Sequence, residues 1–287
     1  MKTYQAGQFK TIALLGNSGS GKTTLAEAML FNGGTIDRRG TIDGKNTASD
    51  YRTIEQENEN SLFSTVLYTE YQNKKLNIFD TPGLDDFCGG VVSSLHAADS
   101  SLLLINVQNG VEVGTEIHFR HADKAVKPVI FVVNGLDHEK TNFDKSIEMM
   151  KDRFGGNVTL VQFPVNEGPE FDSIIDVIKM KMLQYPKDGG EAKILDIPAE
   201  YAEKAADLQG ELIEKAAEND ESLMEIFFEN DTLTEDEMRQ GIQVGLVQRG
   251  IFPVFCTAAK KNVGVDRVME FINNVAPLAS DMPAWQN

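Results

Sequence analysis

The sequence predicts an α/β fold, in which a mostly parallel sheet is flanked by helices and carries an inserted α+β subdomain. Two features of the 287-residue chain predict it. Through the first half, short apolar runs rich in branched residues alternate with longer polar or amphipathic stretches, which is typical of parallel strands separated by helices. Between residues 157 and 250 this rhythm changes, and a long acidic segment with helical periodicity appears.

Five apolar runs are predicted to be the strands of the main sheet. Each is short, rich in branched or aromatic residues, and bounded by polar or turn-forming residues. The predicted strands span residues 11–15, 76–80, 102–107, 129–134 and 253–257.

The change of rhythm divides the chain into four parts. We expect a core at residues 1–156, an inserted acidic subdomain at 157–250, a return to the core at 251–275, and a proline-containing linker at 276–287. Within the insertion, a helix is expected from Pro198 to about Asn219. The predicted buried face of this helix holds Ala202, Ala205, Ala206, Leu212, Ile213 and Ala216.

The composition is that of a soluble globular protein, with 41% hydrophobic and 25% charged residues. The two cysteines, Cys88 and Cys256, lie far apart, and the first residues lack the apolar stretch of a signal peptide or membrane span. These features favour a cytoplasmic protein that enters no membrane. The sequence gives no sign of an oligomer, so we expect a monomer.

The negative charge is concentrated in one segment. The chain carries 44 acidic and 27 basic side chains, a net charge of −17, which disfavours binding to DNA through general electrostatics. Residues 188–237 alone hold 17 acidic and three basic residues. This segment is either a solvated helical face or a docking surface for a basic partner.

The strongest motif is a phosphate-binding loop directly after the first predicted strand. The run GNSGSGKT at residues 16–23 matches the pattern G-x-x-x-x-G-K-[ST] and precedes a helical pattern. Its glycines let backbone N–H groups point at phosphate, Lys22 adds a positive charge, and the Thr23 hydroxyl is placed for Mg²⁺. The sequence therefore predicts a P-loop NTPase fold. The expected phosphate-side residues are Gly16, Asn17, Ser18, Gly19, Ser20, Gly21, Lys22, Thr23 and Thr24.

A second motif, Asp80-Thr81-Pro82-Gly83, follows the strand LNIFD. An aspartate at the carboxyl end of a strand can hold Mg²⁺, and the Gly83 N–H can reach a γ-phosphate. We therefore expect Asp80 and Gly83 to belong to the same nucleotide site. Taken alone, the four residues are equally compatible with a plain turn.

Two further segments are predicted to bind the base. Asn134 and Asp137 follow the strand VIFVVN, where Asp137 can accept the guanine N1 and N2 hydrogens and Asn134 can brace the loop. Gly135 stands where guanine-binding proteins of this pattern carry a lysine that covers the base. After FPVFCT, residues Ala258, Ala259 and Lys260 are expected to line the base, with Lys260 as a candidate cover.

With these motifs in this order, the sequence resembles the nucleotide-binding domain of elongation factor G, a translational GTPase that acts on the ribosome. The resemblance extends over nearly the whole chain and includes DRRGTIDG, INVQNGVEVGTE and the long stretch beginning DIPAEYAEKAADLQGELIEK. That last stretch resembles the inserted subdomain characteristic of this family. The family continues for several further domains, so the resemblance implies that residues 276–287 lead toward them.

The resemblance implies a GTP or GDP site with Mg²⁺ held by Thr23, Ser61 and Asp80. It also marks two departures. Asn60 and its two predecessors replace the family's Arg-Gly-Ile, and Leu84 replaces the histidine that orients the attacking water. A leucine cannot donate or accept a hydrogen bond, so we assign no catalytic residue and expect slow or absent GTP hydrolysis.

The resemblance also implies partners. In this family the inserted subdomain contacts the basic ribosomal stalk protein, so Glu203, Glu211, Glu214 and Glu218 are candidates for that surface. Three alternatives to a translocation factor stay open at this point. They are a nucleotide-dependent ribosome-binding module without hydrolysis, a ribosome-protection or recycling factor, and an unrelated ATPase.

Overall fold

Seven strands form the central sheet of the computed structural model, which describes residues 3–187 and 190–282. Neighbouring strands are parallel except for the first two of the spatial order, which are antiparallel. The predicted mostly parallel sheet is therefore confirmed. In spatial order the strands are β2 (Thr65–Tyr71), β3 (Lys74–Asp80), β1 (Phe9–Leu15), β4 (Ser100–Asn106), β5 (Val129–Asn134), β11 (Phe252–Thr257) and β6 (Val158–Leu160).

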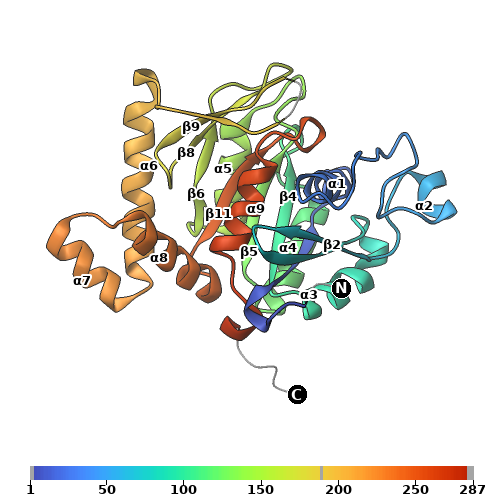
Figure 1. Ribbon diagram of the computed structural model, residues 1–287, viewed down its shortest axis with the longest axis horizontal. Coiled ribbons are helices and arrows are strands. Elements are labelled where there is room, and N and C mark those ends of the chain that lie inside the picture. Colours follow the sequence, from blue (N-terminus) through green and yellow to red (C-terminus); the bar gives the residue numbers. More distant parts are fainter. Residues whose placement is uncertain (1–2, 188–189, 283–287) are drawn as a thin grey trace.

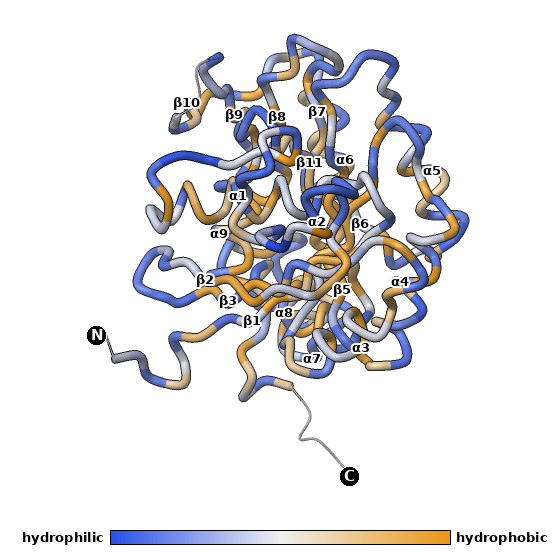
Figure 2. Tube along the Cα trace, turned by 90° about the vertical axis from the view of Figure 1, so that its right-hand side faces the viewer, coloured by the Kyte–Doolittle hydropathy of each residue, from blue (hydrophilic) through white to orange (hydrophobic). Residues whose placement is uncertain are grey.

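Helices cover both faces of this sheet (Figure 1). Figure 2 shows the apolar strands between α1 and α9 on one side and α3, α4 and α5 on the other. The helices are α1 (Lys22–Asn32), α2 (Thr53–Asn58), α3 (Cys88–Ala97), α4 (Val113–Lys124), α5 (Phe143–Phe154) and α9 (Val265–Asn274). Short 3-10 turns lie at η1 (Ala6–Gln8), η2 (Asp85–Phe87), η3 (Ala259–Lys261) and η4 (Ala279–Asp281).

The strands that sequence patterns identify best are those buried on both faces. All six residues of β5 are buried, as a central parallel strand requires. The edge strand β2 was not predicted, and it alternates buried with exposed positions, leaving Val66 64% and Tyr68 53% exposed. Because polar and apolar residues are mixed along β2, its sequence resembles the polar stretches that separate the other strands.

The inserted region builds a second, smaller sheet and three helices. The antiparallel sheet has the order β10 (Lys193–Leu195), β9 (Lys181–Gln184), β8 (Ser173–Asp176) and β7 (Gln162–Pro164). Helix α6 (Ala199–Glu218) packs against α7 (Glu221–Asn230) and α8 (Glu235–Gln248). Strand β6, which opens the predicted insertion, pairs with β11 and so extends the main sheet.

Helix α6 occupies nearly the predicted range, but its buried face differs at three positions. Ala202 and Ala206 are exposed, whereas Ala217 is buried in addition to the other predicted residues. Figure 1 shows the first turns of α6 extending beyond α7 and α8, so residues there have fewer neighbours to pack against. The predicted burial of Ala202 and Ala206 is therefore wrong.

The described part of the predicted linker begins in contact with the core. Ala276 is 1% exposed, and its carbonyl accepts a hydrogen bond from the Lys10 ammonium group. The turn η4 lies against β1. Residues 283–287 of the predicted linker lie outside the described residues. Within the described residues, every helix is too short or too polar to cross a bilayer.

The register of the parallel strands aligns their polar carboxyl ends. Asn134 of β5 is opposite Asn106 of β4 and Thr257 of β11, and Asp80 of β3 is opposite Leu14 of β1. Because parallel strands end at the same edge of a sheet, four sequence-distant segments meet there. This edge positions the site.

Candidate nucleotide-binding site

A cavity of about 700 Å³ lies where the carboxyl edge of the sheet meets the N-terminus of α1. The segment between α1 and β2 supplies a further part of its wall. Among the residues predicted for the site, the cavity is lined by Ser18, Gly19, Ser20, Gly21, Lys22, Thr23, Thr24, Ser61, Gly83, Asn134, Asp137, Ala259 and Lys260. Gly16, Asn17, Asp80 and Ala258 lie outside this lining.

The loop between β1 and α1 depends on glycine at two contacts. Gly16 has φ +133°, and a Cβ there would lie 2.5 Å from the Leu104 carbonyl oxygen. Gly21 has φ +94°, and a Cβ there would overlap the side-chain amide of Asn134. Larger residues would strain both positions, so these glycines allow the loop to curl against the sheet.

Lys22 lies along this loop at the first turn of α1. Its ammonium group donates to the carbonyls of Gly16 at 2.8 Å and Asn17 at 2.9 Å. Burial lowers the pKa of Lys22 to about 8, while Asp80 and Asp50 oppose that shift. A phosphate at this position would supply the negative charge that the buried ammonium group lacks.

Hydroxyl groups and one carboxylate form the candidate Mg²⁺ site. Thr23 Oγ1 donates to Asp80 Oδ2 at 2.7 Å and lies 3.1 Å from Ser61 Oγ. Ser49 Oγ also donates to Asp80 Oδ2, at 2.6 Å. Asp80 is fully buried, and its Oδ1 atom has no hydrogen-bond partner among the described residues. An unpartnered carboxylate oxygen beside two hydroxyls fits Mg²⁺, which takes oxygen ligands and binds through few carboxylates together with phosphates.

Asp50 is an acidic residue of this region that the sequence motifs did not identify. It lines the cavity, is 6% exposed, and has a buried Oδ1 without a partner in the described structure. Burial raises the pKa of Asp50, although a hydrogen bond from Ser61 opposes the shift. Asp50 lies in the run SDY at residues 49–51, which follows no strand. Its position in the sequence therefore did not mark it as a residue of the site.

At the other end of the cavity, Asn134 joins three segments. Its Nδ2 donates to the Ser20 carbonyl of the phosphate loop at 3.0 Å. Its Oδ1 accepts from Thr257 Oγ1 at 3.1 Å and from the Ala259 N–H at 3.0 Å. With only 8% of its surface exposed, Asn134 braces the loops around it.

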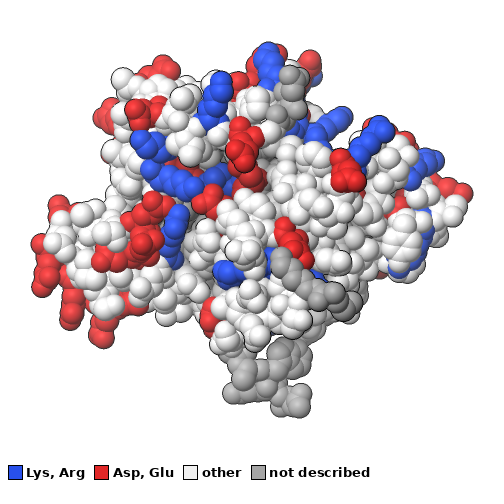
Figure 3. All heavy atoms as spheres, in the orientation of Figure 1, with Lys and Arg blue, Asp and Glu red and all other residues white. Residues whose placement is uncertain are grey.

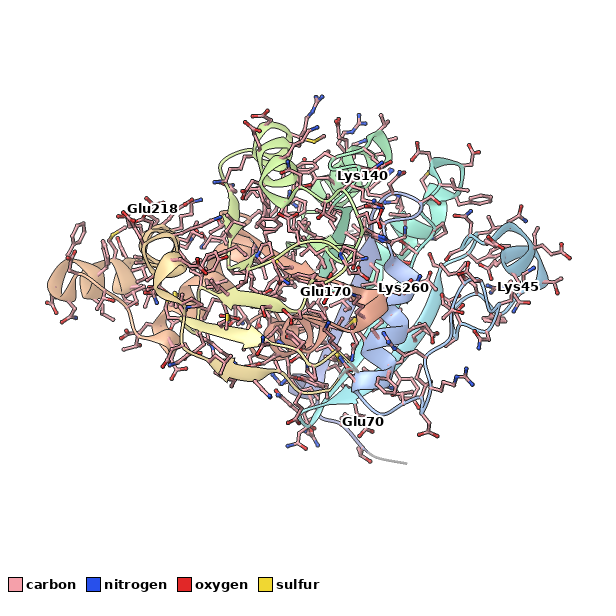
Figure 4. All side chains as sticks on the ribbon, turned by 90° about the horizontal axis from the view of Figure 1, so that it is seen from above. Lys45, Glu70, Lys140, Glu170, Glu218 and Lys260 are labelled. Atoms are coloured by element: carbon pink, nitrogen blue, oxygen red, sulfur yellow. The ribbon has the colours of Figure 1, made fainter. Side chains whose placement is uncertain are left out.

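Asp137 and Lys260 border this end of the cavity, but Ala258 does not. Ala258 is fully buried, and its N–H donates to the Val263 carbonyl at 3.1 Å. This hydrogen bond belongs to the β-bridge between residues 258 and 263, so the Ala258 N–H is already bonded within its own loop. Figure 4 shows Lys260 beside α1, close to the centre of the molecule.

Gly83 packs directly on the phosphate loop. A Cβ there would lie 2.5 Å from the Lys22 ammonium group and 2.6 Å from the Ser18 nitrogen. The next residue, Leu84, is 39% exposed and does not line the cavity. Ser18 Oγ donates to Asn60 Oδ1 at 2.5 Å, so one departure from the family pattern contacts the phosphate loop.

A buried histidine supports the phosphate loop from behind. His118 of α4 is fully buried, and its Nδ1 accepts the Gly16 N–H at 2.8 Å. Burial lowers the pKa of His118 to about 3, so its ring is neutral at physiological pH. A lone histidine within a helical pattern carries no sequence signal for such a role.

The described residues contain no cluster of three or more His, Cys, Asp or Glu side chains of the kind that holds a metal through protein ligands alone. The Asp80 site relies instead on hydroxyls and one carboxylate.

Comparisons with known proteins agree with the fold and the motifs. The profile of the family described as elongation factor Tu GTP binding domain matches residues 8–278. The chain is 34% identical over 277 residues to elongation factor G of Ureaplasma parvum, covering 96% of this chain and 40% of that protein. It is 29% identical to an elongation factor G-like protein of Thermotoga maritima, covering 96% of this chain and 39% of that one.

A solved structure from Thermus thermophilus is similar, with a TM-score of 0.88, 28% identity, and coverage of 95% of this chain and 41% of that one. The chain thus spans about two fifths of the length of the relatives that it matches.

The buried carboxyl of Asp80 generates a prediction for stability. Burial raises its pKa to about 6, so the folded protein binds more protons than the unfolded chain between about pH 4 and 6. Stability from this group is present below pH 4 and is lost as the pH rises through 6. Without nucleotide and in the presence of EDTA, the Asp80→Asn protein should have the same free energy of unfolding as the original chain at pH 4. At pH 7 it should be more stable by up to about 3 kcal/mol.

Urea unfolding at both pH values measures this difference. An Asp80→Asn protein that is less stable than the original chain at pH 7 would contradict the assignment.

Proposed function

Since this chain belongs to the elongation factor Tu GTP binding domain family, we propose that it binds GTP and GDP with Mg²⁺ as part of an elongation factor G-type translation factor. One observation carries the proposal: a single cavity is bordered by a phosphate loop at one end and by Asp137 at the other. The phosphate loop supports binding of any nucleotide, whereas a carboxylate at the base end favours guanine, which presents N–H donors that adenine lacks.

Different residues are proposed to bind different parts of the nucleotide. Lys22 and the loop amides hold the phosphates, and Thr23, Ser61 and Asp80 hold Mg²⁺, whose charge neutralises the phosphate oxygens. Asn134 keeps the two ends of the cavity at a fixed separation through its hydrogen bonds. Asp137 reads the base. The ribosome in a cytoplasmic setting is the proposed place of action, and the chain is proposed to act as a monomer.

The test of this function is a titration with three nucleotides. We expect GTP and GDP to bind and ATP to bind much more weakly. Asp137→Ala should lower the affinity for GDP by about 10- to 100-fold, since two hydrogen bonds to a charged group are lost, and should leave the affinity for ADP unchanged. Fluorescence titration measures the affinities for GDP and for ADP. Equal affinity for GDP and ADP in the original chain would favour an ATPase and defeat the proposal.

Hydrolysis is proposed to be slow. Leu84 stands after Gly83 without a polar group, and neither Asp85, Asp86 nor His96 lines the cavity to replace it. A nucleotide-dependent ribosome-binding module is therefore the second candidate function. In that case the bound nucleotide stabilises a conformation, and its turnover is dispensable.

Replacing Leu84 tests this point. Leu84→His should raise ribosome-stimulated phosphate release at least about tenfold, because a water-orienting group contributes to phosphoryl transfer, whereas Leu84→Met should stay slow. The rate of phosphate release on purified ribosomes is measured for the original chain, Leu84→His and Leu84→Met. If the original chain releases phosphate within tenfold of an ordinary elongation factor G, slow hydrolysis is disproved.

The acidic insertion is proposed to bind the basic ribosomal stalk protein. Figure 3 shows acidic side chains gathered around α7 and α8, at the outer end of the inserted region. On α6, Glu203, Glu214 and Glu218 are exposed, whereas Glu211 is half-buried and paired with Lys215 at 2.9 Å. Opposite charges on the partner would raise the rate of association.

Charge reversal of the three exposed residues tests the stalk surface. The triple variant Glu203→Lys, Glu214→Lys and Glu218→Lys should bind the stalk protein at least about tenfold more weakly at low salt. The matched control is Glu57→Lys on α2, at the opposite side of the molecule (Figure 1). Surface plasmon resonance measures the affinity of the triple variant and of Glu57→Lys for the stalk protein. Unchanged binding of the triple variant would remove the stalk from the proposed partners.

A further inference from the structure

A strap, defined here as residues 33–48 between α1 and α2, borders the cavity and is fastened to its walls. Glu27 of α1 is 2% exposed, and its carboxylate accepts the N–H groups of Gly40 at 2.7 Å and Ala48 at 2.5 Å. These two bonds fix both ends of a turn of the strap. Its middle, represented by Lys45 in Figure 4, extends outward from the molecule.

Two adjacent arginines of the strap border the cavity, but they differ in their surroundings. Arg38 is exposed, whereas Arg39 is half-buried. Arg39 Nη1 donates to the Ala259 carbonyl at 2.9 Å, which links residues 220 positions apart. The central carbon of its guanidinium lies 5.9 Å from the centroid of the Phe31 ring. Burial lowers the pKa of Arg39, and Glu27 opposes this shift.

These contacts place a fixed, planar cation at the base end of the cavity. Ala259, which accepts the Arg39 hydrogen bond, donates its own N–H to Asn134, so Arg39 is attached to a loop that lines the cavity together with Asp137. One edge of the guanidinium is bonded and the group lies over Phe31, which limits its rotation. A guanidinium held in this way offers a flat face for stacking on an aromatic ring.

Gly135 and Lys260, the two positions considered for covering the base, do not offer such a face. Gly135 has no side chain, and a Cβ there would lie 2.8 Å from the His138 ring. Lys260 is exposed and ends in an ammonium group, which is a point charge without a plane. Among the described cations that line the base end, Arg39 is therefore the one that combines a planar charged group with a fixed position, and both properties favour stacking on a purine.

We propose that Arg39 is a base-binding residue, whose guanidinium stacks on the purine ring of the bound nucleotide. This inference rests on the proposed nucleotide function and adds the residue that covers the base. It makes one residue of the strap part of the binding site, so that Arg39 and Asp137 contact the same ring, one at its face and one at its edge.

The experiment compares a ligand that has a base with one that lacks it. Calorimetric titration with GDP and with inorganic pyrophosphate, both with Mg²⁺, is applied to the original chain and to Arg39→Ala, Arg39→Lys and Arg38→Ala. Arg39→Ala should weaken GDP binding about tenfold and leave pyrophosphate binding within about twofold. Arg39→Lys should show the same loss for GDP, since lysine keeps the charge but not the plane.

Arg38→Ala is the matched control, because it removes the same charge from the neighbouring residue. It should change both affinities less than about twofold. Equal losses for GDP and pyrophosphate in Arg39→Ala, a loss in Arg38→Ala as large as that in Arg39→Ala, or unchanged GDP binding in Arg39→Ala would each overturn the proposal. If the original chain binds pyrophosphate but no guanine nucleotide, the proposed function fails and this inference fails with it.

Thermal unfolding of each variant accompanies the titrations. If Arg39→Ala unfolds below the temperature of the titration, the folded Arg39→Lys protein decides the question. Full GDP affinity in Arg39→Lys would then count against stacking.

Discussion

The hydrogen bonds of the Asn134 side chain hold the candidate site together. One amide reaches the phosphate loop through Ser20, the β11 strand through Thr257 and the base-end loop through Ala259. Ser20 and the continuous stretch from Thr257 to Ala259 are far apart in the chain, and both lie beside Asn134 because the parallel strands end in register at one edge. Buried polar groups that are fully hydrogen-bonded add rigidity and specify one arrangement. Asn134 thus links the phosphate end to the base end, in addition to the register of the strands.

The phosphate end carries buried charge that the protein alone balances incompletely. Burial lowers the pKa of Lys22 and raises that of Asp80, although the two charges attract each other. Desolvation therefore outweighs their mutual attraction, as is common for buried pairs. A bound phosphate and Mg²⁺ would supply the missing partners.

The chain's sequence predicted the parts of the fold whose apolar residues follow a clear pattern. The strand ending at Asn134 and the helix beginning near Pro198 lie where the patterns placed them, because continuous apolar runs and helical spacing mark them directly. The edge strand β2 was missed because threonines occupy its buried positions Thr65 and Thr69, which leaves no continuous apolar run. Strand β6 was assigned to the insertion, since the sequence cannot show that it pairs with β11.

The candidate site was predicted where a motif has fixed spacing and missed where only tertiary contact matters. The phosphate loop, Asp80 and Asn134 each follow a strand, which makes them visible in the sequence. His118 and Arg39 contact the site across more than 100 and more than 200 residues, with no pattern to mark them. For Ala258 the motif gave no sign that its N–H is bonded within its own loop.

Hydrogen–deuterium exchange tests most directly whether one ligand spans both ends of the cavity. The account predicts that GDP with Mg²⁺ slows exchange in residues 17–24 and in residues 135–138 together, whereas pyrophosphate with Mg²⁺ slows it only in residues 17–24. Protection by GDP that is confined to the phosphate loop, or absent from both segments, would contradict the account.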